Sequence, residues 1–472
     1  MIKNIDILIE NAVVKTMDTN KNFFMDGTIA IKKKDIIDIG TAAELKGKYQ
    51  ASKTINGKNK LVTPGLINSH THISGTLSRG MIDDLAFTPW VEKKNYVMSR
   101  SLDEDNYYIS TMQLALEMVK TGTTCFVDCG TVQGLESSTV KAIEIIGIKA
   151  ILGRLMMDVA DSFGTANRRR EGSTEKNLTM GEEFIQKWDK AADGRIQAWL
   201  CPIQVSSISN ELCVESAKLA KKYGVGILTH ASVTPEDVEP CIKKHGTTPV
   251  DRFYRLGVLG PNFLAAHAGW ITEQEMMQLK ETGANISHVP SASMKCGYGS
   301  LSMGKFPELV AIGVNVGLGS DGPSASSFQD MVRTMYMVAG GHKEARVDPR
   351  VMNPEIAVEM ATVNNAKALL WADKTGSLEM GKRADVVIFD LMRPEWIPWN
   401  ESNLTSNLVY AASGNSADTV IIDGRIIVEG GVLKTADEHE IMEKAQEASK
   451  KFQLVADEWE AVRPKANAIS RA

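Results

Sequence analysis

The sequence predicts an α/β fold in which a (β/α)8 TIM barrel is joined to a small β-sandwich formed by both ends of the chain. Two observations lead to this prediction. Short apolar runs alternate with longer amphipathic stretches through the middle of the chain, which is typical of repeated strand and helix units around a parallel sheet. Strand-like segments with Gly and Asn-Gly turns fill the first 64 residues and return after residue 376, so the two ends are expected to pair.

With 472 residues, the chain is long enough for one large domain and an accessory unit. The composite β-sandwich is expected at 1–64 and 377–435, the barrel at 65–376, and a C-terminal helical segment at 436–472. Barrel strands are expected near residues 66, 124, 150, 198, 227, 264, 285 and 315. Eight parallel strands close naturally into a barrel. The C-terminal segment has apolar residues at helical spacing among many charges, which predicts a surface helix with a frayed tail.

The composition is that of an ordinary globular protein, with 43% hydrophobic and 24% charged residues. A formal net charge of -5 provides no basic surface for nucleic acid. No run approaches the roughly 18 apolar residues that span a bilayer, and the N-terminus does not resemble a signal peptide. The six cysteines form no CxxC pair and are interpreted as reduced thiols. We therefore expect a cytoplasmic protein that binds neither nucleic acid nor membranes.

The candidate metal ligands stand at the ends of predicted barrel strands. His70 and His72 follow the run VTPGLINS, and because residues two apart on a strand point to the same side, both imidazoles can reach one ion. Four further candidates end later apolar runs: His230, His267, His288 and Asp321. The C-terminal ends of barrel strands carry active sites, so these side chains are expected to meet there. Three histidines lie in polar or helical contexts and are interpreted as surface residues: His245, His342 and His439.

Five motifs follow one another along the chain: PGLINSHTH, GILTHA, AAHAGW, ISHVPSAS and GLGSDG. This ordered set resembles the amidohydrolase superfamily, in particular its cytosine deaminase-like and chlorotriazine hydrolase-like branch, over nearly the whole chain. The resemblance implies one divalent metal ion per chain, with four ligands: His70, His72, His230 and Asp321. It also implies that His267 is hydrogen-bonded to the metal-bound water.

Such an ion lowers the pKa of its water toward neutrality, so that the resulting hydroxide can attack an electrophilic sp2 carbon. Asp321 can take a proton from that water while it stays beside the metal, so Asp321 and His267 are the expected catalytic residues. Zinc(II) is the expected metal, and Fe(II), Mn(II) and Co(II) are alternatives because they accept similar nitrogen and oxygen ligands.

The sequence departs from this branch at the position of the usual proton shuttle. Deaminases of the branch carry a Glu three residues after the barrel histidine, whereas HASVTPEDVEP places Val233 there. An aliphatic side chain can neither donate nor accept a proton. Glu236 would fill the role only after a slip of three residues in the alignment. Ile203, next to Gln204, also replaces the histidine that usually follows proline in deaminases of adenosine-like substrates.

The substrate-binding residues are expected to be His288, Val233, Trp90 and Gln204. Trp90 lies in DDLAFTPWVEKKNY, at the position of a loop that commonly covers the substrate in this family. Ordinary packing is the alternative interpretation of this tryptophan. The apolar residues Ile203 and Val233 predict a substrate that is smaller or more apolar than a purine.

The leading hypothesis is a metal-dependent hydrolase of a C-N bond in a small cyclic or heteroaromatic substrate, similar to the aminohydrolases. A hydrolase of ureas, carbamates or ring substituents such as chloro or thio groups is the alternative, because those leaving groups need at most one proton. A non-catalytic barrel is a third alternative, which the retention of all four ligands disfavours. The family resemblance and the amphipathic C-terminal segment predict a homodimer or a larger homo-oligomer.

Overall fold

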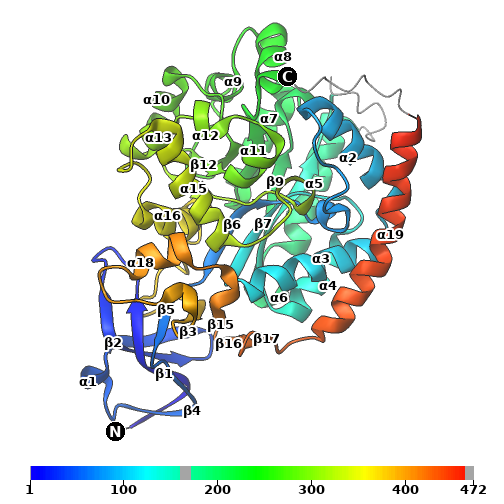
Figure 1. The fold of residues 1–472 in the computed structure, drawn as a ribbon. Helices are drawn as coiled ribbons and strands as arrows, with labels where there is room; N and C mark the ends of the chain where they lie inside the picture. The colour runs from blue at the N-terminus through cyan, green and yellow to red at the C-terminus, as the bar shows by residue number, and fades with distance from the viewer. Residues whose placement is uncertain (1, 160–171, 463–472) are drawn as a thin grey trace.

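The barrel predicted from the sequence is present in the computed structural model, which describes residues 2–159 and 172–462. Eight parallel strands form one sheet in chain order (Figure 1). These strands are β6 (Leu66–Thr71), β7 (Thr123–Thr131), β8 (Lys149–Met156), β9 (Ile196–Pro202), β10 (Ile227–Ala231), β11 (Phe263–His267), β12 (Asn285–His288) and β13 (Val316–Leu318). Each strand lies where an apolar run predicts it, because burial on both faces selects apolar residues. The expected barrel fold is confirmed.

Side chains close the barrel at the seam between its last strand, β13, and its first strand, β6. The Nδ2 of Asn365, in α17 (Val363–Ala368), donates to the carbonyl groups of Ile67 and Leu318 at 2.6 and 2.8 Å. Its Oδ1 accepts from the Leu318 N–H at 2.9 Å. Gly317 leaves room for this amide, since a Cβ there would lie 1.9 Å from the Asn365 Oδ1. This glycine of the VNVGLGSDG motif therefore serves barrel closure.

Helices between the strands begin and end where the sequence provides caps. α3 (Glu104–Lys120) begins after Asp103, whose side chain accepts a hydrogen bond from the first turn. α7 (Asn210–Tyr223) begins after Ser209 in the same way and ends at Gly224, which has a φ of 68°. Both helices bury their apolar faces against strands of the barrel. The amphipathic stretches therefore form the outer layer of the barrel.

The two chain ends meet in a second, nine-stranded mixed sheet. The N-terminal part supplies β1 (Lys3–Lys15), β2 (Phe23–Lys32), β3 (Asp35–Thr41), β4 (Tyr49–Asn56) and β5 (Lys60–Pro64). The C-terminal part supplies β14 (Val386–Asp390), β15 (Ala417–Ile422), β16 (Arg425–Glu429) and β17 (Val432–Leu433). β5 joins the two parts, because it pairs in parallel with β1 and in antiparallel orientation with β14. The predicted pairing of the two chain ends in one small β-structure is confirmed.

A buried ion-pair cluster fastens this mixed sheet to the barrel. The Nζ of Lys149, at the start of β8, lies 2.5 Å from an oxygen of Asp385 and 2.7 Å from an oxygen of Asp423. All three side chains are almost completely buried. Removal of one partner would leave an uncompensated buried charge, which costs about 3–5 kcal/mol in comparable proteins. The cluster therefore holds the mixed sheet in place against the barrel.

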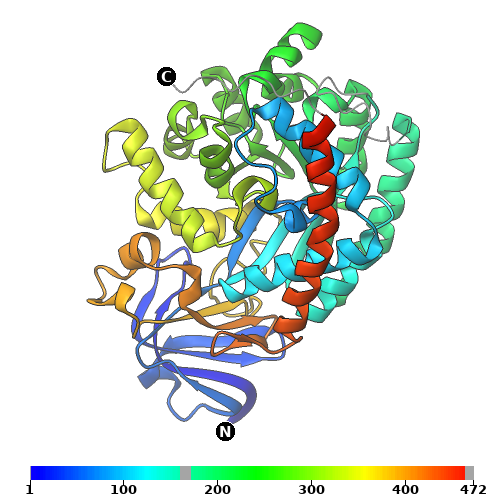
Figure 2. The ribbon, with the colours of Figure 1, turned by 45° about the vertical axis from the view of Figure 1, so that its right-hand side comes forward.

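The C-terminal segment forms α19 (Glu438–Val462), which runs along the outside of the barrel (Figure 2). It packs against α2 (Phe87–Ser101) and α3, and it buries Phe452 and Trp459 there. The apolar face predicted from the sequence is therefore used within the chain. The tail at 463–472, expected to be frayed, lies outside the described residues. No helix in the described part of the chain is long and apolar enough to cross a membrane.

Candidate active site

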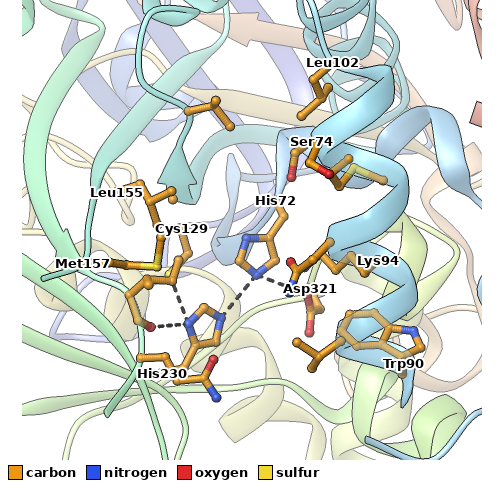
Figure 3. Close-up of a pocket in the computed structure, with 18 of the residues that line it drawn as sticks. His72, Ser74, Trp90, Lys94, Leu102, Cys129, Leu155, Met157, His230 and Asp321 are labelled. Carbon is orange, nitrogen blue, oxygen red and sulfur yellow. Dashed lines mark hydrogen bonds and ion pairs between the residues drawn. The ribbon is translucent and has the colours of Figure 1, made fainter. Parts of the chain in front are cut away.

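Four imidazoles and one carboxylate converge at the C-terminal end of the barrel. His70 and His72 come from the end of β6, His230 from β10, His267 from β11, and Asp321 from the turn after β13. The Nε2 of His72 lies 3.2 Å from the Nε2 of His230 and 3.6 Å from the Oδ1 of Asp321. The Asp321 Oδ1 also lies 3.9 Å from His70 Nε2, and its Oδ2 lies 3.7 Å from His267 Nε2. The sequence motifs thus meet in one cluster, part of which Figure 3 shows.

The cluster fits a divalent metal ion. The Nε2 of His70 is buried and has no hydrogen-bond partner among the described residues, so its lone pair is available to a cation. The Nδ1 of His230 lies 2.7 Å from the carbonyl oxygen of Ile203. Because a carbonyl only accepts, this nitrogen carries the proton, and Nε2 keeps its lone pair toward His72. Neutral imidazoles and a carboxylate are typical ligands of zinc and of other first-row metals.

Burial keeps three of the four imidazoles neutral. It lowers the pKa of His70, His72 and His267 well below 6.5, and the positive charge of Lys94 acts in the same direction. Burial also raises the pKa of Asp321 above 3.8, while the charge of Lys94 acts against this shift. The ring nitrogens of these three histidines therefore present lone pairs at neutral pH, as metal binding requires. Burial also acts to lower the pKa of His230, but its contacts with Cys129 and the Ile203 carbonyl raise this pKa above 6.5.

The cluster opens onto a cavity of about 690 Å³, a volume typical of small-molecule sites. Helix α2 forms one wall and contributes Trp90 and Lys94 (Figure 3). The opposite side carries Cys129 and Met157. Among the described residues that line the cavity, Asp321 is the sole carboxylate. The site thus combines a candidate metal centre with an open cavity large enough for a small molecule.

A sequence model of the Amidohydrolase family matches residues 61–427, which is more than half of the chain. The chain belongs to the amidohydrolase family. A 5'-deoxyadenosine deaminase of Methanosarcina mazei is 33% identical over 447 residues, which are 95% of this chain and 98% of the relative. A 5-methylthioadenosine/S-adenosylhomocysteine deaminase of Syntrophobacter fumaroxidans is 31% identical over 441 residues, which are 93% of this chain and 97% of the relative.

Solved structures share the fold of this amidohydrolase. An adenosine deaminase from Xanthomonas campestris with bound zinc has a TM-score of 0.88 at 23% identity, over 96% of this chain and 100% of that chain. An atrazine chlorohydrolase from Arthrobacter aurescens TC1 complexed with zinc has a TM-score of 0.85 at 22% identity, over 94% of this chain and 100% of that chain. Family membership and the deaminase relatives identify the protein as a hydrolase of carbon–nitrogen bonds other than peptide bonds, with a small-molecule substrate.

The position of the usual shuttle glutamate lies on the cavity wall of this amidohydrolase. Val233 is 3% exposed and lines the cavity. Glu236, the alternative shuttle, lies in α8 (Pro235–His245) and lines a second cavity. Asp321 is the sole carboxylate among the described residues that line the first cavity. No other carboxylate there replaces the missing shuttle. The departure seen in the sequence is therefore a change in the wall that a substrate would touch.

Three of the four predicted substrate-binding residues line the cavity: Val233, Trp90 and Gln204. The fourth, His288, is not among the described residues that line it. The His288 ring stacks on Phe306 with the ring centroids 3.6 Å apart, and its Nε2 lies 3.0 Å from the Nε2 of His342. His342 belongs to α15 (Met331–Arg346), so His288 faces the helix layer instead of the cavity. His342 itself is fully buried in this contact, and its interpretation as a surface residue is wrong.

Asp321 is held in an unusual backbone conformation. Its φ is 70°, in the left-handed region that non-glycine residues rarely adopt. Four side chains donate to its carbonyl oxygen: Gln329 at 2.7 Å, Ser320 at 3.0 Å, Ser326 at 3.1 Å and Thr71 at 3.2 Å. Strained conformations persist where the surroundings hold them, as they do here. Gln329 was outside the predicted set, and the polar run SASSFQD after Asp321 is the signal that could have pointed to it.

Lys94 and Tyr298 are among the cavity residues that were outside the predicted set. The Tyr298 ring centroid lies 6.0 Å from that of His267 and 5.6 Å from that of Phe87. Lys94 follows Trp90 by four residues, a spacing that places both on one face of α2. Its Nζ lies 5.0 Å from the centre of the Trp90 ring. The helical spacing in WVEKK is the signal that could have found Lys94.

Proposed function

We propose that this amidohydrolase hydrolyses a C-N bond of a small cyclic or heteroaromatic substrate with one divalent metal ion, held by four residues: His70, His72, His230 and Asp321. The observation that carries the proposal is the meeting of these imidazoles and a carboxylate beside a cavity of about 690 Å³. Zinc(II) is the preferred ion, because this ligand set suits it and solved structures of the same fold contain it. Fe(II), Mn(II) and Co(II) are the alternatives.

When bound, the ion would lower the pKa of a water molecule and polarise the group under attack. Asp321 faces two ligand histidines with Oδ1 and His267 with Oδ2. Its Oδ2 can therefore accept a proton while Oδ1 stays on the metal side. We assign Asp321 as the proton acceptor and His267 as the residue that orients the nucleophile by a hydrogen bond. Both side chains are buried, which limits the access of bulk water to this proton transfer.

The cavity wall suits a flat ring. Trp90 and Val233 offer apolar surface, and Gln204 adds an amide. The Gln204 Nε2 lies 3.5 Å from the Oδ1 of Asp237, a buried acid of α8. This contact uses the amide nitrogen and leaves the Gln204 Oε1 to accept a hydrogen bond from the substrate. We therefore assign Trp90, Val233 and Gln204 to substrate binding.

A second function is favoured by Val233. Without a carboxyl group at this position, protonation of a ring nitrogen and of departing ammonia lacks its usual shuttle. Hydrolysis of a urea, a carbamate or a chloro or thio substituent needs one proton at most, which Asp321 or His267 can supply. The relatives that are named as deaminases favour an amine leaving group, whereas the Val233 wall favours the alternative.

A substrate panel tests the proposal and separates the two functions. The metal-loaded protein would be assayed with 5'-deoxyadenosine, 5'-methylthioadenosine, aminopyrimidines, aminotriazines, chlorotriazines, ureas and carbamates, and ammonia would be measured in each reaction. We expect C-N hydrolysis that stops on chelation and returns with zinc. Hydrolysis of ring substituents without ammonia release would select the alternative. A protein with one metal per chain that turns over nothing on the panel would refute the proposal.

We also propose that the enzyme works in the cytoplasm as a homodimer or larger homo-oligomer. The six cysteines are free thiols, which suits a reducing compartment. Tyr336, in α15, and Tyr410 are exposed aromatic residues whose ring centroids lie 6.2 Å apart, and this apolar surface suits association. Light scattering at micromolar concentration would test the assembly, and a monomer would refute it.

A further inference from the structure

Two adjacent lysines of α2 point in different directions. The Nζ of Lys93 lies 2.5 Å from a carboxylate oxygen of Glu460 and thereby ties α2 to α19. Lys94 instead lines the active-site cavity, with its Nζ 5.0 Å from the centre of the Trp90 ring. In Figure 3, Lys94 lies on the same side of the cavity as Asp321 and Trp90. This lysine therefore brings a positive charge to the place where a substrate would bind.

Lys94 lines the same cavity as three residues of the metal cluster: His72, His230 and Asp321. An ammonium group carries three donor hydrogens. Such a group can donate to an anionic ligand oxygen while it also contacts protein neighbours.

The described lining of the cavity contains little negative charge. Asp321 is its sole carboxylate, and metal binding would use that group. Arg100, further along α2, lines the same cavity and adds a second cation. The Glu that deaminases of this branch carry would place another carboxylate in the cavity, where it would repel an anion, and Val233 removes that repulsion. The second cation and the absence of a second carboxylate both favour a substrate with negative charge.

We propose that Lys94 binds an anionic oxygen of the substrate, either a carboxylate on the ring or an ionised ring oxygen, and so selects anionic heteroaromatic substrates. The inference rests on the proposed function, because it names the substrate class of the same site. A ring packed against Trp90 would bring such a group near the ammonium. Lys94 is thus a specificity-determining residue.

Binding of matched neutral and anionic rings tests this inference. Isothermal titration calorimetry on the zinc-loaded protein would compare 2-aminopyrimidine-4-carboxylate with 2-aminopyrimidine-4-carboxamide, which has nearly the same shape without the charge. We expect the wild type to bind the carboxylate about tenfold more tightly, or better, since a hydrogen bond between charged groups contributes that much. Lys94→Met should lose most of the preference, and Lys94→Arg should keep most of it.

Lys187→Met is the matched control. Lys187 also lies over a tryptophan, with its Nζ 4.6 Å from the centre of the Trp188 ring, but it is exposed and is not part of the cavity lining. This variant should keep the wild-type preference, and thermal melting of every variant would confirm that the fold is intact.

Two results would overturn the inference. The first is that the wild type binds the carboxylate no more tightly than the carboxamide, or that it does not bind the carboxylate measurably. The other is a Lys94→Met variant that keeps the preference, because the anion would then bind the metal ion directly. The readout does not depend on turnover. A Lys94-dependent preference without hydrolysis of any substrate would refute the proposed function and leave the anion-binding role of Lys94 standing.

Discussion

The backbone N–H of Val233 donates a hydrogen bond to the carboxylate of Asp237, with 3.2 Å between N and Oδ2. Asp237 is buried, and burial raises its pKa to about 6. It lines the second cavity, whereas Val233 lines the cavity of the metal cluster. Asp237 therefore holds the cavity wall at Val233 in place and does not face the candidate substrate site.

We expect Val233→Glu to lower turnover of the preferred substrate. The new carboxyl group would lie in a buried wall, where an ionised carboxyl without a partner is strongly disfavoured or takes up a proton. It would also repel an anionic ring. Steady-state turnover of the variant and the wild type on the same substrate panel provides the measurement, with Val233→Gln as a control of similar shape and no charge. A clear gain in ammonia release by Val233→Glu, with no loss on any other substrate, would contradict this expectation.

Asp321→Asn should reduce kcat by about 100-fold or more, because an amide cannot accept the proton. Metal content should change much less, since the amide keeps the shape and one oxygen of the carboxylate. Parallel measurement of kcat and bound metal separates the two effects. Asp457→Asn, on the exposed side of α19, is the control and should behave like the wild type. If Asp321→Asn retained activity within a few-fold while still holding metal, Asp321 would not be the proton acceptor.

The purified protein should contain about one divalent metal ion per chain. The two candidate ligand groups in the described residues share His70, so they belong to a single centre. Mass-spectrometric metal analysis of protein prepared without chelators provides the number. His70→Asn should lose most of the metal, whereas His439→Asn, at an exposed position of α19, should not. Two metal ions per chain, or none after reconstitution, would rule out the mononuclear site.

Acid should destabilise the fold partly through His342. Burial lowers the pKa of His342 from 6.5 to about 4, and nearby Arg346 acts in the same direction while Glu308 opposes it. Between these two pKa values the unfolded chain binds a proton that the folded protein does not, so the free energy of unfolding falls as the pH falls from 6.5 toward 4. The full loss from this group is ~3 kcal/mol.

Urea unfolding at pH 7, 6 and 5 measures this dependence. We expect His342→Leu to show a shallower decline of the free energy of unfolding than the wild type, because leucine does not titrate. His439→Leu, which changes an exposed histidine, should decline as the wild type does. Identical pH dependence in the wild type and His342→Leu would show that His342 does not contribute.

The strands and the candidate ligands could be found from local patterns. Each barrel strand is an apolar run with a turn signal beside it, and His70 and His72 have the spacing that one strand face requires. Parallel strands of a barrel end at one rim, so residues at those ends come together without any further information. His230 and Asp321, far apart in the chain, reach His72 for this reason.

The direction of a side chain at a strand end could not be found in this way. His267 and His288 both end apolar runs, yet His267 faces Asp321 and His288 faces His342. Barrel strands are buried on both faces, so hydropathy does not distinguish the cavity side from the helix side. His342 was missed because the polar residues beside it in GGHKEAR hide the buried face of α15.

The sequence by itself determined the barrel, the pairing of the two chain ends and the candidate ligands, because periodicity and strand order are local properties of the chain. Only the tertiary structure decided the charge of the cavity. It turned Lys94 inward and Lys93 toward Glu460, and it directed Asp237 behind the Val233 wall. These directions depend on how α2 and α8 pack against segments that are distant in the sequence, and no local pattern encodes that packing.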